Sequence, residues 1–241
     1  MKTSYFNSPV ITPPAIAASV QHAAFAVGDV VFDWASFEIP RGTAKLLGAT
    51  IVMVGKNVTA GTPQPAGIDL IFARDTAVSA TPTTLGVGNA DPTSPFRNDI
   101  IGVMPSGTAD LVGGRTTYQG TVSSCELVLE PLPTTGSNVG VDKYWVAGIA
   151  SGAITFESDC TVDGTPGTGQ ANLDIEDVLG SLIFQVGDVV HDEDDRLMGT
   201  VAAVTDDTNI LMVANLANAG INDKKLYPLN PVKSIVLHFS K

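Results

Sequence analysis

The residues best suited to chemistry in this chain of 241 residues are acidic, and they gather near its C-terminal end. Asp188 and the run Asp-Glu-Asp-Asp at 192–195 form the densest group, with His191 between them. Carboxylate oxygens at this density can bind Ca²⁺, but the run lacks the Asp-x-Asp-x-Asp-Gly spacing of a calcium loop. Since such a run between two strand-like segments is also typical of a solvated turn, we predict a turn and no metal site.

The other polar residues form no recognisable catalytic pattern. His22, His191 and His238 lie far apart, and no HExxH or HxH motif is present, so no zinc site is indicated. No GxSxG surrounds a serine, and neither cysteine has a catalytic context. Asp69 and Glu126 are conceivable paired carboxylates of a glycosidase, although paired acids on strands are ordinary in β proteins. We therefore predict no catalytic residue, no cofactor and no enzymatic activity.

Two tryptophans, Trp34 and Trp145, lie in strand-like segments. Most tryptophans in such positions belong to a core, and a platform on which a sugar ring stacks is the functional alternative. Cys125 and Cys160 are the two cysteines. A single disulfide bond between them stays open, but two thiols in a reducing cytosol are the simpler expectation.

Charge narrows the choice of partners. The chain has 25 acidic and 13 basic residues and a net charge of −12, and its bases are scattered. Such a surface repels phosphate groups, so we expect neither nucleic-acid binding nor attachment to an anionic membrane. The N-terminal residues carry no basic cluster and no continuous apolar stretch, and three prolines interrupt them. A signal peptide is therefore not indicated, and we expect synthesis in the cytoplasm.

The hydrophobic pattern predicts an all-β protein, with short runs rich in β-branched residues between turns of Gly, Pro, Asn and Asp. We expect an extended N-terminal arm at 1–24, and a β-sandwich of jelly-roll type at 25–160 with a long loop excursion at 76–120. A small barrel-like meander at 161–233 and a final strand at 234–241 that returns to the main sheet complete this prediction. Residues 175–182 are the best helix candidate, with Asp174 as the predicted cap.

One stretch occurs almost twice. Residues 25–33 read FAVGDVVFD and residues 184–192 read FQVGDVVHD, so that seven of nine positions agree. The weaker similarity of 45–54 to 196–204 favours duplication of a longer unit. Gly-Asp is, however, a common turn pair, and Val-Val begins a strand well. We therefore interpret the repeat as one strand opening used twice, with duplication as the alternative.

The order of these segments resembles that of a known family. GDVVFDWASFEIPRGTAKLLGATIVMVG (28–55), IDLIFARD (68–75) and KYWVAGIASGAITF (143–156) resemble virion structural proteins of tailed bacteriophages, particularly those on the heads of marine phages. GDVVHDEDDRLMGTVAAVTDDTNILM (187–212) followed by KLYPLNPVKSIVLHF (225–239) is similar to their small barrel-like ends. The similar segments consist of packing and turn motifs. The long helix of a major capsid protein is not indicated.

This resemblance implies a non-enzymatic capsid decoration or other head-associated protein that assembles as a homo-oligomer, often a trimer, on the capsid surface. Its partners would be copies of itself and the major capsid protein. An arm of 24 residues reaches on the order of 75 Å when extended, enough to cross to a neighbouring subunit. A carbohydrate- or surface-binding β module of a phage tail or an exported adhesin is the alternative. The predicted interface residues, in the arm and in the 76–120 excursion, are Tyr5, Phe6, Val10, Ile11, Ile16, Phe96, Ile100, Ile101 and Met104.

Overall fold

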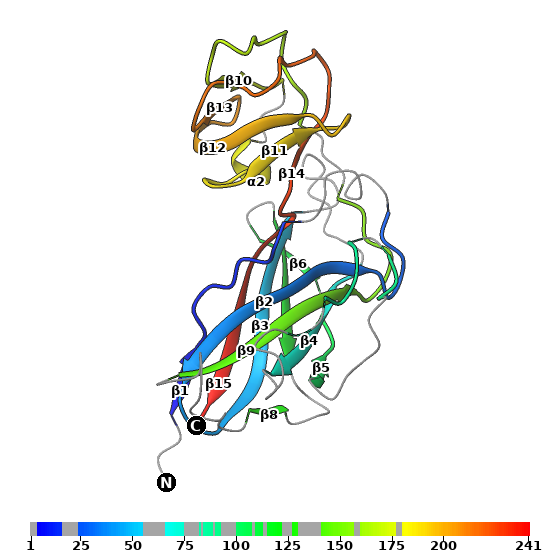
Figure 1. The fold of residues 1–241 in the computed structure, drawn as a ribbon, viewed down its shortest axis with the longest axis vertical. Helices are drawn as coiled ribbons and strands as arrows, with labels where there is room; N and C mark the ends of the chain where they lie inside the picture. Colours follow the sequence, from blue (N-terminus) through cyan, green and yellow to red (C-terminus); the bar gives the residue numbers. More distant parts are fainter. Residues whose placement is uncertain are drawn as a thin grey trace.

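A computed structural model shows a β-sandwich that carries a smaller β-domain at one end (Figure 1). Both ends of the chain lie at the opposite end of the sandwich. Among the described residues, no helix has the length and apolar character needed to cross a bilayer. The structure describes residues 4–15, 24–54, 66–74, 82, 84–88, 90–92, 100–107, 109–112, 115–121, 127–129, 141–156, 160–176 and 180–241.

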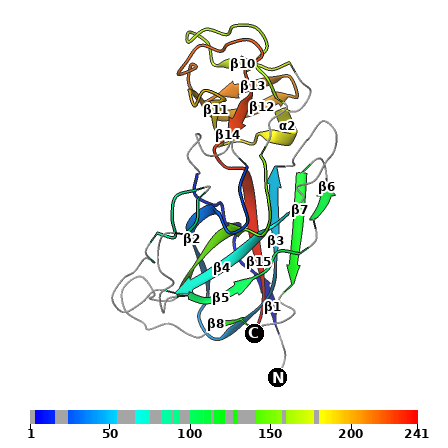
Figure 2. The same cartoon turned by 90° about the vertical axis from the view of Figure 1, so that its right-hand side faces the viewer.

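The sandwich consists of two antiparallel sheets, which Figure 2 shows from the side. The first sheet runs in the order β1 (Tyr5–Asn7), β15 (Val232–Ser240), β3 (Ala44–Val54), β7 (Arg115–Thr121) and β6 (Ala109–Val112), and β8 (Leu127–Leu129) also pairs with β3. The second sheet runs in the order β2 (Val30–Pro40), β9 (Val141–Ala150), β4 (Ile68–Arg74) and β5 (Ile100–Met104).

The core lies between the two sheets because their strands alternate apolar and polar residues. In β2, Phe37 and Ile39 are buried, whereas the intervening Glu38 is exposed. The Phe37 ring lies near aromatic rings of both sheets, with centroid distances of 6.0 Å to Tyr144 and 6.3 Å to Phe239. The structure thus confirms the predicted all-β class and sandwich.

The smaller domain has its own sheet, in the order β10 (Asn172–Asp174), β13 (Asn209–Met212), β12 (Leu197–Asp206), β11 (Val189–Asp192) and β14 (Leu226–Pro228). Residues 160–163 join the outer strands β14 and β10, and so close the sheet into a small barrel, which removes its open edges. The four backbone hydrogen bonds of this closure, donor first, are Val162 to Lys224, Leu226 to Cys160, Asp163 to Asp174 and Glu176 to Thr161.

The predicted helix at 175–182 is wrong at its start. Ile175 forms a β-bridge with Val162 instead, residues 177–179 lie outside the described residues, and the helix α2 covers Gly180–Ile183. Tertiary pairing has overridden the local preference here. The backbone N–H of Ser181, at the start of α2, donates to the Asp207 carboxylate, so Asp207 and not the predicted Asp174 binds this end of the helix.

The region 76–120 was predicted to be a long loop excursion. Its described parts instead contain the strands β5, β6 and β7. Strand β7 pairs with β3 over seven residues, although its sequence RTTYQGT is polar. Threonine suits a strand because it is β-branched, but a polar strand gives no apolar alternation to detect. A second described part, 84–88, covers the outer face of the second sheet, where Leu85 is buried against Val30, Ile71 and Ala147.

The N-terminal segment, residues 4–15, packs along β15 of the same chain and does not project from it. Strand β1 pairs with the end of β15, and Ile11 forms a further bridge with Ile235. Phe6 stacks on Phe239 with ring centroids 5.2 Å apart. Residues 234–241, for which a return to the main sheet is predicted, belong almost entirely to β15, which also pairs with β3. The segment therefore completes the first sheet at its edge.

This arrangement predicts that the N-terminal segment stabilises the sandwich. Ile11 is 5% exposed in the core, so Ile11→Ala is expected to lower the free energy of unfolding by about 2–4 kcal/mol. Val10→Ala is the matched control, since Val10 is 65% exposed and a surface change costs at most about 0.5 kcal/mol. Urea denaturation followed by tryptophan fluorescence measures both, and equal effects would contradict the structural role of Ile11.

Candidate functional site

The two copies of the repeated sequence fold into the same turn. Gly28 has φ 92° and Gly187 has φ 91°, the positive value that a type II turn requires at its third residue. A Cβ added at either glycine would meet nothing within 4 Å, so the backbone conformation and not lack of space explains these glycines. The aspartate N–H donates to the residue three positions earlier, from Asp29 to Ala26 (3.2 Å) and from Asp188 to Gln185 (3.1 Å).

The agreement extends to the aspartate side chains and to the following strands. Asp29 Oδ2 accepts the Ala26 N–H at 2.6 Å, and Asp188 Oδ2 accepts the Gln185 N–H at 2.9 Å. Each turn then opens a strand with an antiparallel neighbour, β2 with β9 and β11 with β12. The repeated sequence therefore encodes a turn and a strand opening in two different domains.

The two turns differ in one respect. Asp188 Oδ2 lies 2.5 Å from Nζ of Lys233, and the side chains of both residues are nearly fully buried. Lys233 belongs to β15 of the sandwich, so this ion pair joins the two domains.

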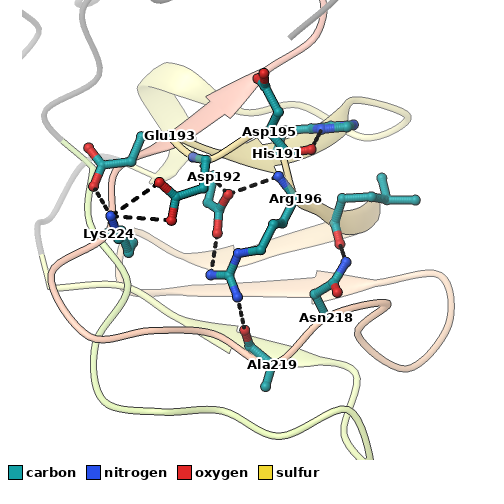
Figure 3. Close-up of polar contacts among 10 residues, drawn as sticks. His191, Asp192, Glu193, Asp195, Arg196, Asn218, Ala219 and Lys224 are labelled. Carbon is teal, nitrogen blue, oxygen red and sulfur yellow. Dashed lines mark hydrogen bonds and ion pairs between the residues drawn. The ribbon is translucent and has the colours of Figure 1, made fainter. Parts of the chain in front are cut away.

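The acidic run 192–195 is a turn between β11 and β12, held by its first residue (Figure 3). The Asp192 carboxylate is buried and accepts the backbone N–H groups of Asp194 (3.0 Å) and Arg196 (2.9 Å). It also forms an ion pair with the Arg196 guanidinium. Asp195 has φ 62°, a left-handed conformation that Asp tolerates better than most residues. Both oxygens of the Asp192 carboxylate thus bind groups of the turn itself.

Lys224 neutralises the outer part of this run. Its Nζ lies 2.9 Å from the Glu193 carboxylate and 3.3 Å from the Asp194 carboxylate. Figure 3 joins Lys224 and Glu193 by a dashed line. Hydrogen bonds with Glu193 and then Asp194 raise the pKa of Lys224 above its ordinary value. The turns at 192–196 and 222–224 are therefore linked by charge on the barrel surface.

A second acidic group lies on the same domain. The Thr161 hydroxyl donates to Glu176 at 3.1 Å and lowers the pKa of that carboxyl. Desolvation and the carboxylates of Asp223 and Asp163 raise the pKa more, so that it lies above its ordinary value. Like charges are thus held together at this surface.

Neither acidic group forms a cation site. Within the described ranges, no three His, Cys, Asp or Glu side chains converge in a way that could hold a metal ion. The carboxylates of the 188–195 region bind backbone N–H groups, Arg196, Lys224 and Lys233 instead.

The other candidates from the sequence are dispersed. Asp69 in β4 accepts the Ser106 N–H at 2.9 Å, and Glu126 lies outside the described residues. His238 bridges Asn7 and Thr50 on the first sheet, at 2.9 and 3.0 Å. His191 is in the barrel, and its Nδ1 lies 3.1 Å from the Asp195 carbonyl oxygen. His22 and Cys125 lie outside the described residues, and Cys160 is fully buried in the barrel core.

The structure places the two tryptophans on the same face of one sheet. Trp34 in β2 and Trp145 in β9 lie on neighbouring strands, because Ser36 pairs with Trp145. Their sequence neighbours Ala35, Tyr144 and Val146 belong to the sandwich core, so both indoles lie on the outer face of the second sheet and are half-buried. Nζ of Lys143 lies 4.8 Å from the Trp145 ring centroid.

The predicted interface residues fall into different environments. Tyr5 and Val10 are exposed at the edge of the sandwich, and Phe6, Ile100 and Ile101 are half-buried. Ile11 and Met104 are buried in the sandwich core, so their side chains present no surface to a partner. Ile16 and Phe96 lie outside the described residues.

Sequence reasoning missed Lys233 and the loop-binding aspartates Asp33 and Asp142. Asp33 accepts the Leu85 N–H at 2.9 Å, and Asp142 accepts the Gly42 N–H at 2.9 Å. Their partners are distant in sequence, so nothing local marks these contacts. Lys233 did carry a signal, because it precedes Ile235, Leu237 and Phe239 at the two-residue spacing of a buried row.

The chain matches no protein-family model, no curated protein and no solved structure at a significant level. Its residues and their geometry therefore carry the functional argument.

The raised pKa of Glu176 predicts a pH-dependent stability. Because the folded state holds the proton more tightly than the unfolded state, ionisation of Glu176 destabilises the fold as the pH rises above its ordinary pKa of 4.5. Glu176→Gln is expected to melt at a higher temperature than the wild type at pH 7, and the difference should vanish below about pH 4. Glu193→Gln is the control, since it removes a favourable contact with Lys224. Thermal melts at both pH values measure this, and a lower melting temperature of Glu176→Gln at pH 7 would contradict it.

Proposed function

We propose that the chain is a non-enzymatic virion structural protein, a capsid decoration protein that stabilises the head of a tailed bacteriophage. It acts as a homo-oligomer on the capsid surface, with the major capsid protein as its partner. The trimer is the form implied by the resemblance of its segments to head-associated proteins. The observation that carries the proposal is an uncharged, exposed strip on one edge of an otherwise acidic chain.

The strip is formed by the N-terminal segment where it lies along β15. Residues 4–15 contain no charged side chain, and Tyr5 and Val10 are 74% and 65% exposed. Their neighbours Phe6 and Ile11 hold the segment on the sandwich, so the strip is presented as an ordered surface. A surface of this kind binds through apolar and backbone contacts, which tolerate an acidic chain because they do not depend on charge.

The distribution of charge supports an orientation. Residues 160–232 contain twelve acidic and three basic residues, so they carry −9 of the net charge of −12. Burying many carboxylates against a partner is costly, because each must be desolvated and paired. We infer that the sandwich edge faces the capsid and that the acidic barrel projects towards solvent, where its charge limits adsorption of nucleic acid during assembly.

The proposal predicts that Tyr5 and Val10 bind phage heads. Tyr5→Ser with Val10→Ser removes about 2–3 kcal/mol of apolar burial, so affinity for heads stripped of their decoration protein is expected to fall about thirtyfold to 150-fold. Mass photometry of the free protein and sedimentation with the heads measure oligomer size and binding. Val186→Ser with Val213→Ser is the control, since both valines are 69% exposed on the barrel. A wild type that neither oligomerises nor binds heads would overturn the proposal.

The adjacent tryptophans favour a second candidate function, a carbohydrate-binding β module of a phage tail or an exported adhesin. Two half-buried indoles lie on one outer sheet face, and stacking of sugar rings on their exposed parts would supply the binding. Nζ of Lys143 lies over the Trp145 ring. This candidate places the partner on the face of the second sheet and not at the strip.

The second candidate predicts binding to a glycan array that depends on Trp145. Trp145→Ala is expected to weaken such binding about tenfold or more, because stacking adds roughly 0.5–1.5 kcal/mol to the loss of buried area. Tyr5→Ala is the control, since Tyr5 is an exposed aromatic residue away from this face. Glycan binding that survives Trp145→Ala, or a wild type that binds no glycan, would exclude this candidate.

A further inference from the structure

We propose that the buried ion pair between Asp188 and Lys233 is an interdomain lock that fixes the orientation of the small barrel on the sandwich. The inference concerns the fold alone and does not depend on the proposed function. It rests on the position of the pair, on a bulge that aims the lysine, and on the short connection beside it.

The pair crosses the boundary between the domains. Asp188 follows the type II turn that opens β11 of the barrel, and Lys233 is the second residue of β15 in the sandwich. Nζ and Oδ2 are 2.5 Å apart, and the two side chains are 1% and 2% exposed. The same Oδ2 accepts the Gln185 N–H at 2.9 Å, which holds the carboxylate in place on the barrel side.

A bulge in β15 aims Lys233 at this partner. Pairing between β15 and β3 shifts register between Val232 and Ser234, so Lys233 is the extra residue. Without the shift, Lys233 would fall on the row of Ile235, which faces the sandwich core. The bulge instead lets Val232 fill the core and releases the lysine towards the barrel. Such a bulge changes the direction of a side chain without ending the strand.

Beside the pair, the described chain passes from the barrel to the sandwich over a short stretch. Leu229 N–H still donates to Val189 in the barrel, and the Pro231 carbonyl already accepts the Val54 N–H of β3. Asn230 is thus the single residue between the last barrel contact and the first sandwich contact on this strand. Val54, at the end of β3, packs in the barrel core and forms a second point of contact. An apolar contact such as that of Val54 permits the barrel to rotate relative to the sandwich. An ion pair beside this contact restricts that rotation, because the two charges must stay close together.

The physical effect of such a pair is on specificity more than on stability. Desolvation of two buried charges offsets most of their attraction, so a buried pair adds little net free energy. Any rotation that separates them while both stay buried loses the attraction that compensates their desolvation, which costs several kcal/mol. Alternative barrel orientations are therefore penalised even though the observed one gains little.

The test compares charge variants of the full chain by small-angle X-ray scattering and ¹⁵N relaxation. In the wild type, we expect both domains to share one rotational correlation time. In Lys233→Met, and in Asp188→Asn with Lys233→Met, we expect loss of the shared correlation time and a broader distribution of interatomic distances. The double variant is the critical one because it leaves no buried charge and keeps the side-chain volumes similar, so that folding is retained.

The repeated turn supplies the matched control. Asp29→Asn alters the same turn contact in the sandwich, where Asp29 binds the Ala26 N–H and belongs to no ion pair among the described residues. It is expected to keep the shared correlation time. If the double variant is folded and its domains still share one correlation time, the lock does not exist and packing around Val54 sets the orientation. Loss of the shared correlation time in Asp29→Asn as well would also overturn the proposal.

Discussion

The fold depends on one recurring interaction, an aspartate carboxylate that accepts backbone N–H groups outside the sheets. A chain with about half as many bases as acids has too few cations to pair its carboxylates, and a turn-rich chain has many N–H groups that no strand partner satisfies. A hydrogen bond from a backbone N–H to an aspartate carboxylate satisfies both groups at once. Aspartates that accept an N–H in this way are Asp29, Asp33, Asp69, Asp142, Asp188, Asp192, Asp206 and Asp207.

These contacts also shape the electrostatics of the molecule. A carboxylate that accepts backbone N–H groups is stabilised in its charged form, as at Asp206, where the Thr208 N–H lowers the pKa. The balance reverses at Glu176, where the Thr161 hydroxyl lowers the pKa but desolvation and the carboxylate of Asp223 raise it more. These eight aspartates thus serve the fold, and the interface that we propose lies along residues 4–15, which contain no acidic residue.

The sequence was sufficient to predict the class of fold. It was insufficient to predict the contacts between segments that are distant in the sequence. Alternating residues in β15 predict a two-faced strand, because the pleat sends successive side chains to opposite faces. The polar β7 gave no such signal, and the helix predicted at 175–182 is wrong at its start because Ile175 pairs with Val162. Local pattern carries no information about partners distant in the chain. The tryptophans show the same limit, since only the register of β2 and β9 makes Trp34 and Trp145 neighbours.

The repeated turn shows how one local structure acquires two roles. In both copies, the aspartate carboxylate accepts the N–H of the residue three positions earlier. The turn itself therefore accounts for the sequence similarity. What separates them is the setting, because only Asp188 is buried against a lysine from the other domain. In the sequence, that lysine has the two-residue spacing of the buried row Ile235, Leu237 and Phe239, where a charge is unfavourable unless a partner lies within reach. A charged residue at the spacing of a buried row is therefore the sequence feature that indicates this contact between domains. The bulge at Lys233 is how the backbone of β15 accommodates the charged residue.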